Sequence, residues 1–170
     1  FSKYNSNEKL PFLKLIDPKY SFDFLGGMFL SVFRRELWCQ NVNSLNDKAL
    51  RDMRVFSHFD NTFPHVKVFA SAFKNSNAYF HQEPLSVCLT GAREWSPKYP
   101  LVKSVRLIEA LDWYRENGLP FSQYYRCKNF GLSNFLPDLV SMYVHKEVSG
   151  FEYIKPLQLT LKSLIYPNLY

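Results

Sequence analysis

The clearest pattern in the chain is helical and lies after residue 100. Apolar side chains recur at intervals of three and four residues, at Leu101, Val105, Ile108 and Leu111. Gly118 and Pro120 follow as stop signals, so the pattern predicts a helix over residues 101–117. The side chains expected on its solvent-exposed face are Lys103, Arg106, Glu109 and Asp112.

The pattern remains helical toward the C-terminus. Apolar residues recur at roughly helical spacing between residues 130 and 144, with a break or kink expected around Pro137. A last helix is predicted near residues 156–166. The second part of the chain is therefore expected to be mainly helical.

Shorter apolar runs dominate before residue 98. Residues 1–20 contain two prolines and predict a loop that enters the fold. The run from Phe22 to Phe33 predicts a buried strand, which leads into a helix starting at Arg34-Arg35-Glu36. Residues 78–89 predict a strand or a strand pair. These patterns indicate an α/β portion over 1–97 and a helical region over 98–170, within one structural unit.

A loop-to-helix junction is predicted around residue 60, after a loop with a short helix over residues 40–54. Asn61 or Thr62 can cap a helix whose first turn accepts Pro64. Asp60 would then lie beside a helix N-terminus.

Composition narrows the class of protein. The chain has 170 residues, 46% hydrophobic and 18% aromatic, which is enough for one core and too apolar for disorder. It begins with Phe1, without a recognisable targeting signal, and its longest apolar run is too short to span a bilayer. Three widely separated cysteines are expected to be reduced, in the cytoplasm.

The formal net charge of +6 favours anionic partners, although a solvated basic surface explains it equally well. Lysine and arginine are spread along the whole chain, whereas nucleic-acid-binding proteins usually carry a clustered basic face. The aromatic residues mostly follow core periodicity and do not alternate with basic ones. We therefore expect no nucleic-acid partner.

Four segments in order carry a resemblance to a known family. They are Phe24–Trp38, with its Gly26-Gly27 pair, then Thr62–His65, Glu83–Leu85 and Gly91–Trp95. Over about residues 20–120 the chain resembles the C-terminal, acceptor-side part of family-two glycosyltransferases that act on bacterial surface polysaccharides. The resemblance implies a partial GT-A-type, Rossmann-like sheet followed by the helical region.

The resemblance also implies an activity. In that family a carboxylate deprotonates the acceptor hydroxyl during an inverting transfer, while a divalent metal, Mg²⁺ or Mn²⁺, and basic groups stabilise the departing diphosphate. The partners would be a nucleotide-sugar donor and a growing glycan acceptor, commonly lipid-linked. Peripheral contact at the inner face of the membrane would follow.

Asp60 and His65 are the candidate residues at the predicted junction. The resemblance makes Asp60 the catalytic base, although the family often has an acidic pair where this chain has Phe59-Asp60-Asn61. The alternative is that Asp60 caps its helix. His65 would orient the acceptor or Asp60, and its alternative is a structural role.

Further candidates lie in segments rich in glycine or aromatic residues. Gly26 and Gly27 would let an acceptor sugar approach the backbone, or would form a bulge in a buried strand. Arg93 would bind the diphosphate and Trp95 would offer an aromatic face to a sugar. A surface loop anchored by one buried tryptophan is the alternative for this last pair.

The donor-binding features of the family are absent from these residues. The chain contains no Asp-x-Asp pair and no glycine-rich phosphate loop, and its histidines match no metal-ligand spacing. The metal ligands are therefore expected mostly outside this chain, and the chain alone is expected to be inactive. The other hypothesis is a non-catalytic module that binds a glycan or a protein.

Overall fold

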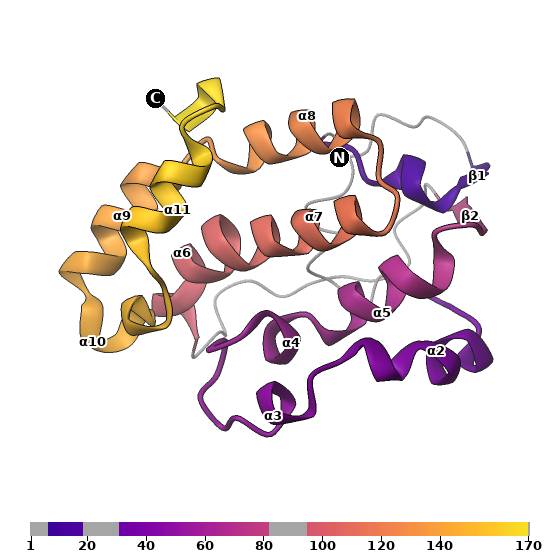
Figure 1. Cartoon of the computed structure of the whole chain (residues 1–170), viewed down its shortest axis with the longest axis horizontal. Helices are drawn as coiled ribbons and strands as arrows, with labels where there is room; N and C mark the ends of the chain where they lie inside the picture. The colour runs from indigo at the N-terminus through magenta and orange to yellow at the C-terminus, as the bar shows by residue number, and fades with distance from the viewer. Residues whose placement is uncertain (1–6, 19–30, 82–94, 170) are drawn as a thin grey trace.

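A computed structural model of the chain describes residues 7–18, 31–81 and 95–169 (Figure 1). The helices are α2 (Arg35–Asn41), α3 (Asp47–Leu50), α4 (Phe59–Thr62), α5 (Pro64–Phe73), α6 (Tyr99–Leu101), α7 (Leu107–Glu116), α8 (Phe121–Gly131), α9 (Phe135–Val144), α10 (Lys146–Ser149) and α11 (Pro156–Ser163). Single 3₁₀ turns cover Phe12–Leu15, Val42–Ser44, Ser96–Lys98, Phe151–Tyr153 and Pro167–Leu169. The strands are β1 (Glu8–Pro11) and β2 (Asn77–Phe80).

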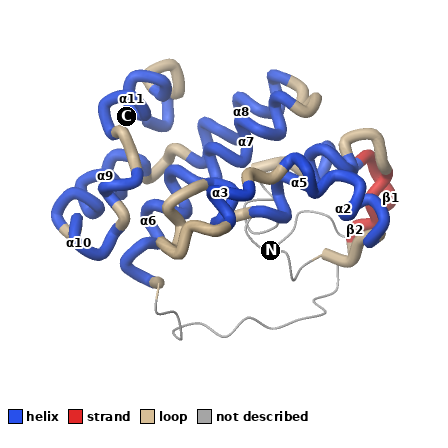
Figure 2. Tube along the Cα trace, turned by 60° about the horizontal axis from the view of Figure 1, so that its bottom comes forward, coloured by secondary structure: helices blue, strands red, loops and turns tan. Residues whose placement is uncertain are grey.

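Helix α7 is the centre of the core. It packs against α8 on one side and α5 on the other, and α2 packs on α5 (Figures 1 and 2). Apolar side chains of these helices and of the N-terminal segment fill the space between them, including Phe12, Ile16, Phe69, Leu111 and Tyr114. A smaller cluster of Leu101, Val105 and Met142 joins the start of the long helix to α9.

The predicted helix over 101–117 is confirmed, although it begins two residues earlier, at Tyr99, and ends at Glu116. Helices α6 and α7 continue into one another through a π-helical segment, Val102–Arg106. Gly118, at φ 104°, ends the run as predicted, since this backbone conformation suits glycine. The prediction of a solvent-exposed Arg106 is wrong. Its side chain is buried because its guanidinium bonds to two backbone carbonyls and to Glu109.

The prediction of a loop over residues 1–20 is wrong for the part that is described. Strand β1 pairs antiparallel with β2, with Leu10 opposite Ala78. Leu10 points into the core, and Pro11 closes the strand at its end. Proline is tolerated at such a position of an edge strand, which is why Pro11 does not prevent the pairing of β1 with β2. Of the predicted strand over 78–89, residues 78–80 belong to β2 and residues 82–89 lie outside the described residues.

The C-terminal region is helical, as predicted. The break expected around Pro137 falls at residues 132–134, between α8 and α9. Pro137 itself lies in the first turn of α9, where its missing N–H has no partner to lose. The predicted last helix is α11. Taken together, the described residues are mostly helical and contain a two-stranded antiparallel sheet.

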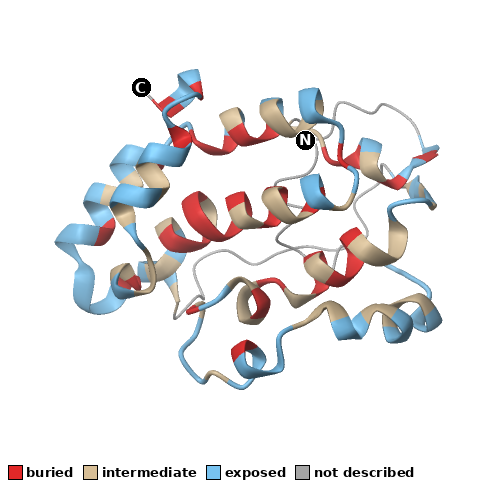
Figure 3. Ribbon diagram, in the orientation of Figure 1, coloured by how far each residue is buried: buried red, intermediate tan, exposed pale blue. Residues whose placement is uncertain are grey.

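Exposure rises sharply from α9 onward (Figure 3). Helix α9 exposes Leu136, Val140, Tyr143 and Val144, which are spaced as one helical stripe. We call this the α9 stripe. The α11 stripe, with the same spacing, consists of Leu157, Leu161, Leu164 and Ile165. These two apolar stripes face solvent, whereas the other sides of both helices contact the core.

Candidate functional site

Asp60 lies at the predicted junction, in the first turn of α4, and its carboxylate is largely enclosed. Lys67 of α5 contacts both carboxylate oxygens, with its Nζ at 3.0 Å from each. Oδ2 also accepts a hydrogen bond from the backbone N–H of Asn46, at 2.5 Å. The exposed fractions of the two side chains are 8% for Asp60 and 14% for Lys67. Asp60 is therefore one half of a buried ion pair.

Lys67 connects this ion pair to the centre of the core. Its ammonium lies 4.8 Å from the centroid of the Trp113 ring, and its backbone carbonyl accepts a hydrogen bond from Trp113 Nε1 at 3.0 Å. A cation over an indole face is attracted by the negative face of the ring. The position of the Asp60 carboxylate is thus fixed by α5 and α7 as well as by its own helix.

The segment before Asp60 is held by a second carboxylate, Asp52. It accepts hydrogen bonds from the backbone N–H and the guanidinium of Arg54 and from the Ser57 hydroxyl. The hydrogen bond from the Arg54 side chain is the main reason why the pKa of Asp52 lies far below its ordinary value. Asn61 closes the network by donating to the Asp52 and Arg54 carbonyls and the Ser57 hydroxyl.

Phe56, in the same segment, has a backbone conformation that is uncommon for a residue with a side chain. Its φ is 64°, and conformations of this kind cost on the order of 1 kcal/mol or more. Arg106 stabilises it by donating to the carbonyls of Phe56 at 3.0 Å and Ser57 at 2.6 Å. Trp95 adds an edge-to-face contact with the Phe56 ring, at 5.3 Å between centroids. The buried Arg106 therefore fixes the backbone of the segment that leads into α4 and Asp60.

Of the other candidate residues, His65 and Trp95 lie among the described residues. His65 is buried in the first turn of α5, with its ring edge-on to Phe63 and Phe69. Trp95 is half-buried against Phe56 and stacks on Tyr99, with 6.1 Å between the centroids. The burial of His65 suits a structural role, whereas Trp95 is half-buried and is not the buried anchor that its alternative described. The candidates Gly26, Gly27 and Arg93 lie outside the described residues.

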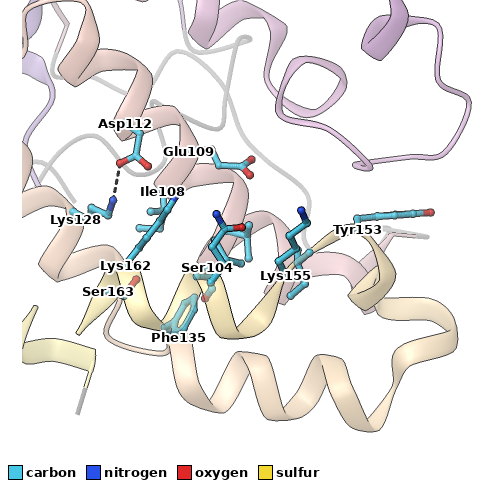
Figure 4. A pocket seen from close by; sticks show the side chains of 14 residues that line it. Ser104, Ile108, Glu109, Asp112, Lys128, Phe135, Tyr153, Lys155, Lys162 and Ser163 are labelled. Carbon is cyan, nitrogen blue, oxygen red and sulfur yellow. Dashed lines mark hydrogen bonds and ion pairs between the residues drawn. The ribbon is translucent and has the colours of Figure 1, made fainter. Parts of the chain in front are cut away.

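A groove lined by both charged and apolar side chains lies elsewhere, between α7 and α11 (Figure 4). Its volume is about 330 Å³, and Ile108, Phe135 and Leu159 contribute apolar surface to it. Glu109 and Asp112 line the α7 side, whereas Lys155, Gln158 and Lys162 line the α11 side. We call it the α7–α11 groove.

The two sides of the groove differ in how their charges are balanced. Glu109 binds the Arg106 guanidinium with both carboxylate oxygens at 2.8 Å. Asp112 accepts hydrogen bonds from Lys128 and from the Tyr124 hydroxyl, each at 2.7 Å. The carboxylates are thus compensated. Lys155 and Lys162 form no ion pair with any other residue of the described ranges.

Within 7–18, 31–81 and 95–169, no group of three or more His, Cys, Asp or Glu side chains is arranged to hold a metal ion. None of the helices in this part of the chain combines the length and the hydrophobicity needed to cross a bilayer.

Comparisons with models of protein families, with curated proteins and with solved structures found no match. The function of the chain must therefore be argued from its own residues.

Several of the residues that shape these sites were not found from the sequence. Lys67 is seven residues from Asp60 and lies on the next helix, so no helical spacing rule pairs them. Lys155 and Lys162 do share one side of α11, at the i, i+7 spacing that a helical projection reveals. That spacing was the only sequence signal for the groove.

Proposed function

We propose that the chain is the acceptor-side part of a nucleotide-sugar-dependent, inverting glycosyltransferase that extends a surface glycan. The observation that supports this most directly is the placement of Asp60. A carboxylate is held in a fixed position at a loop-to-helix junction, at the point in the motif order where the resembled family has its base. A general base must be positioned within hydrogen-bond reach of the proton that it takes.

The hydrogen bonds of Asp60 favour one oxygen for this role. Oδ2 accepts from both Lys67 and Asn46, whereas Oδ1 accepts from Lys67 alone. A carboxylate oxygen has two lone-pair directions, so Oδ1 retains one of them for an acceptor hydroxyl. In this proposal Oδ1 takes the proton as the acceptor oxygen attacks the anomeric carbon of the donor. Lys67 holds the carboxylate in position meanwhile.

The donor side of the reaction is assigned to residues other than the described ones. The divalent metal would supply charge stabilisation for the departing nucleotide diphosphate. Arg93 is the candidate in this chain for binding that diphosphate, and Gly26 and Gly27 are candidates for contact with the acceptor. His65 and Trp95 would support the acceptor site through Phe63 and Phe56, the rings that they contact.

A peripheral position at the inner face of the membrane is part of this proposal. The α9 stripe and the α11 stripe present leucine, valine, isoleucine and tyrosine side chains to solvent. These exposed apolar side chains suit insertion at the surface of a bilayer, where a lipid-linked acceptor would be found.

The test is an assay of the complete enzyme with a panel of nucleotide sugars, with Mg²⁺ or Mn²⁺ present. The measured quantity is the release of nucleotide diphosphate, with and without a glycan acceptor. We expect one donor to be consumed, faster with acceptor than without, and the activity to fall when EDTA is added. If no donor is consumed under any of these conditions, the enzyme proposal is wrong.

A non-catalytic module that binds a glycan or a protein is the second candidate. The observation in its favour is the burial of Asp60 in the ion pair with Lys67, since that pairing alone is a sufficient structural role for a carboxylate. An inactive complete protein that nevertheless binds glycan on an array would support this alternative.

A further inference from the structure

We propose that the α7–α11 groove binds a small soluble ligand that carries two phosphate groups. This site involves neither Asp60 nor the segment before it, and it does not depend on the glycosyltransferase proposal. The inference rests on the charge balance of the groove, on the spacing of its lysines and on its shape.

The charge balance makes the groove a site for an anion. Its carboxylates are already neutralised, Glu109 by Arg106 and Asp112 by Lys128. The ammonium groups of Lys155 and Lys162 have no carboxylate partner among the described residues. A ligand that brings negative charge therefore replaces no existing ion pair. A cationic ligand would have to compete with Arg106 and Lys128 for the two carboxylates.

The spacing of the lysines indicates two anionic groups. Lys155 immediately precedes α11 and Lys162 lies in its last turn, seven residues later. Because a helix rises 1.5 Å per residue, their backbone positions are roughly 10 Å apart along the helix axis. Gln158 lies between them on the same side of the helix and offers an amide. Because both lysine side chains are flexible four-carbon stems, their ammonium groups can converge from these positions on the two neighbouring phosphates of one diphosphate.

The shape of the groove separates this site from an ordinary basic surface. The cavity of about 330 Å³ is within the size range of small-ligand sites. Figure 4 shows the two lysines at opposite ends of the α11 side, Lys162 beside Ile108 and Lys155 near Tyr153, with Asp112 joined to Lys128 on the far side. The compensated carboxylates of Glu109 and Asp112 can still accept hydrogen bonds, so hydroxyl groups of a phosphate ester would find partners on the α7 side.

The experiment is a calorimetric titration of the chain with inorganic pyrophosphate, in a buffer free of divalent metal. The variant Lys155→Gln/Lys162→Gln removes both charges, and Lys48→Gln/Lys74→Gln removes two exposed charges far from the groove. We expect pyrophosphate to bind, with the affinity reduced about tenfold or more in the groove variant and within about twofold of the unmodified chain in the control. Inorganic phosphate should bind more weakly than pyrophosphate.

Three results would overturn the proposal. They are the absence of pyrophosphate binding at about 1 mM, an equal loss of affinity in both variants, and binding only to vesicles that contain phosphatidylglycerol. The last would assign the lysines to lipid headgroups instead of a soluble ligand. Thermal unfolding of both variants should match that of the unmodified chain, because the four lysines are exposed. No nucleotide sugar is used, so the result is independent of the activity assay.

Discussion

At the scale of single residues, the pair formed by Asp60 and Lys67 is the most sensitive point of the candidate site. Removing one charge of a buried pair leaves the other without compensation. We expect Asp60→Asn or Lys67→Met alone to lower the free energy of unfolding by about 3 kcal/mol, measured by urea denaturation. The exposed Asp47→Asn serves as the control and should cost less than about 0.5 kcal/mol.

The double variant tests whether the single variants lose stability because one buried charge is left uncompensated or because packing is lost. In Asp60→Asn/Lys67→Met neither charge remains, and an amide can still interact with the N–H of Asn46 through its oxygen. We therefore expect most of the lost stability to return. If the double variant is as unstable as the sum of the two single variants, the carboxylate and the ammonium are not energetically coupled.

The sequence predicted where Asp60 lies but not what binds it. The junction could be recognised because Pro64 is a local signal, and it lies in the first turn of α5 as expected. The predicted caps were wrong, since Asn61 and Thr62 belong to α4 and Phe63 precedes α5. The contact with Lys67 depends on the turn at Phe63 that sets α5 against α4, and the burial of Arg106 depends on the distant carbonyls of Phe56 and Ser57. Such contacts between segments are set by packing, which a helical pattern does not encode.

At the scale of elements, Gly150 determines how the C-terminal helices join the core. It follows α10 with φ at 78°, and a Cβ atom there would lie 2.8 Å from Leu101 and 3.0 Å from Tyr153. Gly150→Ala should therefore combine backbone strain with overpacking and lower the unfolding free energy by about 3 kcal/mol. Thermal or urea unfolding measures this loss.

Gly118 is the matched control for that substitution. Its φ of 104° is also positive, but a Cβ atom there would meet only Leu13, at an ordinary 3.9 Å. Gly118→Ala should therefore show the cost of backbone strain alone, near 1 kcal/mol. If Gly118→Ala and Gly150→Ala lower the free energy of unfolding equally, then Leu101 and Tyr153 shift to make room for the new Cβ atom at no energetic cost.

Elements with strong local patterns were predicted well, and those that depend on distant partners were not. The long helix around α7 carries its own periodicity and its own stop at Gly118. Strand β1 is four residues long and exists because β2, more than sixty residues later, pairs with it. Without a known partner, Pro11 at its end and Pro18 beyond it made a loop the natural prediction.

At the scale of the whole molecule, the exposed stripes predict where the chain would meet a membrane. Leu157 and Leu161 are 74% and 58% exposed, so Leu157→Ser/Leu161→Ser should leave folding largely intact. We expect the variant to sediment with anionic vesicles about tenfold more weakly at low salt, because less apolar surface enters the bilayer interface. Met53→Gln, at a position that is 92% exposed, is the control and should bind as the unmodified protein does.

Failure of the unmodified protein to sediment with these vesicles would remove the membrane from the proposal. If Met53→Gln weakens vesicle binding as much as Leu157→Ser/Leu161→Ser does, the α11 stripe is not the surface that contacts the membrane.

The measurement that tests the central claim most directly is the turnover of the complete enzyme carrying Asp60→Asn/Lys67→Met, compared with the unmodified enzyme and with Lys67→Met alone. If Asp60 is the general base, turnover in the double variant should fall by about 100-fold or more although its stability has returned, while Lys67→Met retains more activity. Turnover within a few-fold of the unmodified enzyme would contradict the account and leave Asp60 with a structural role only.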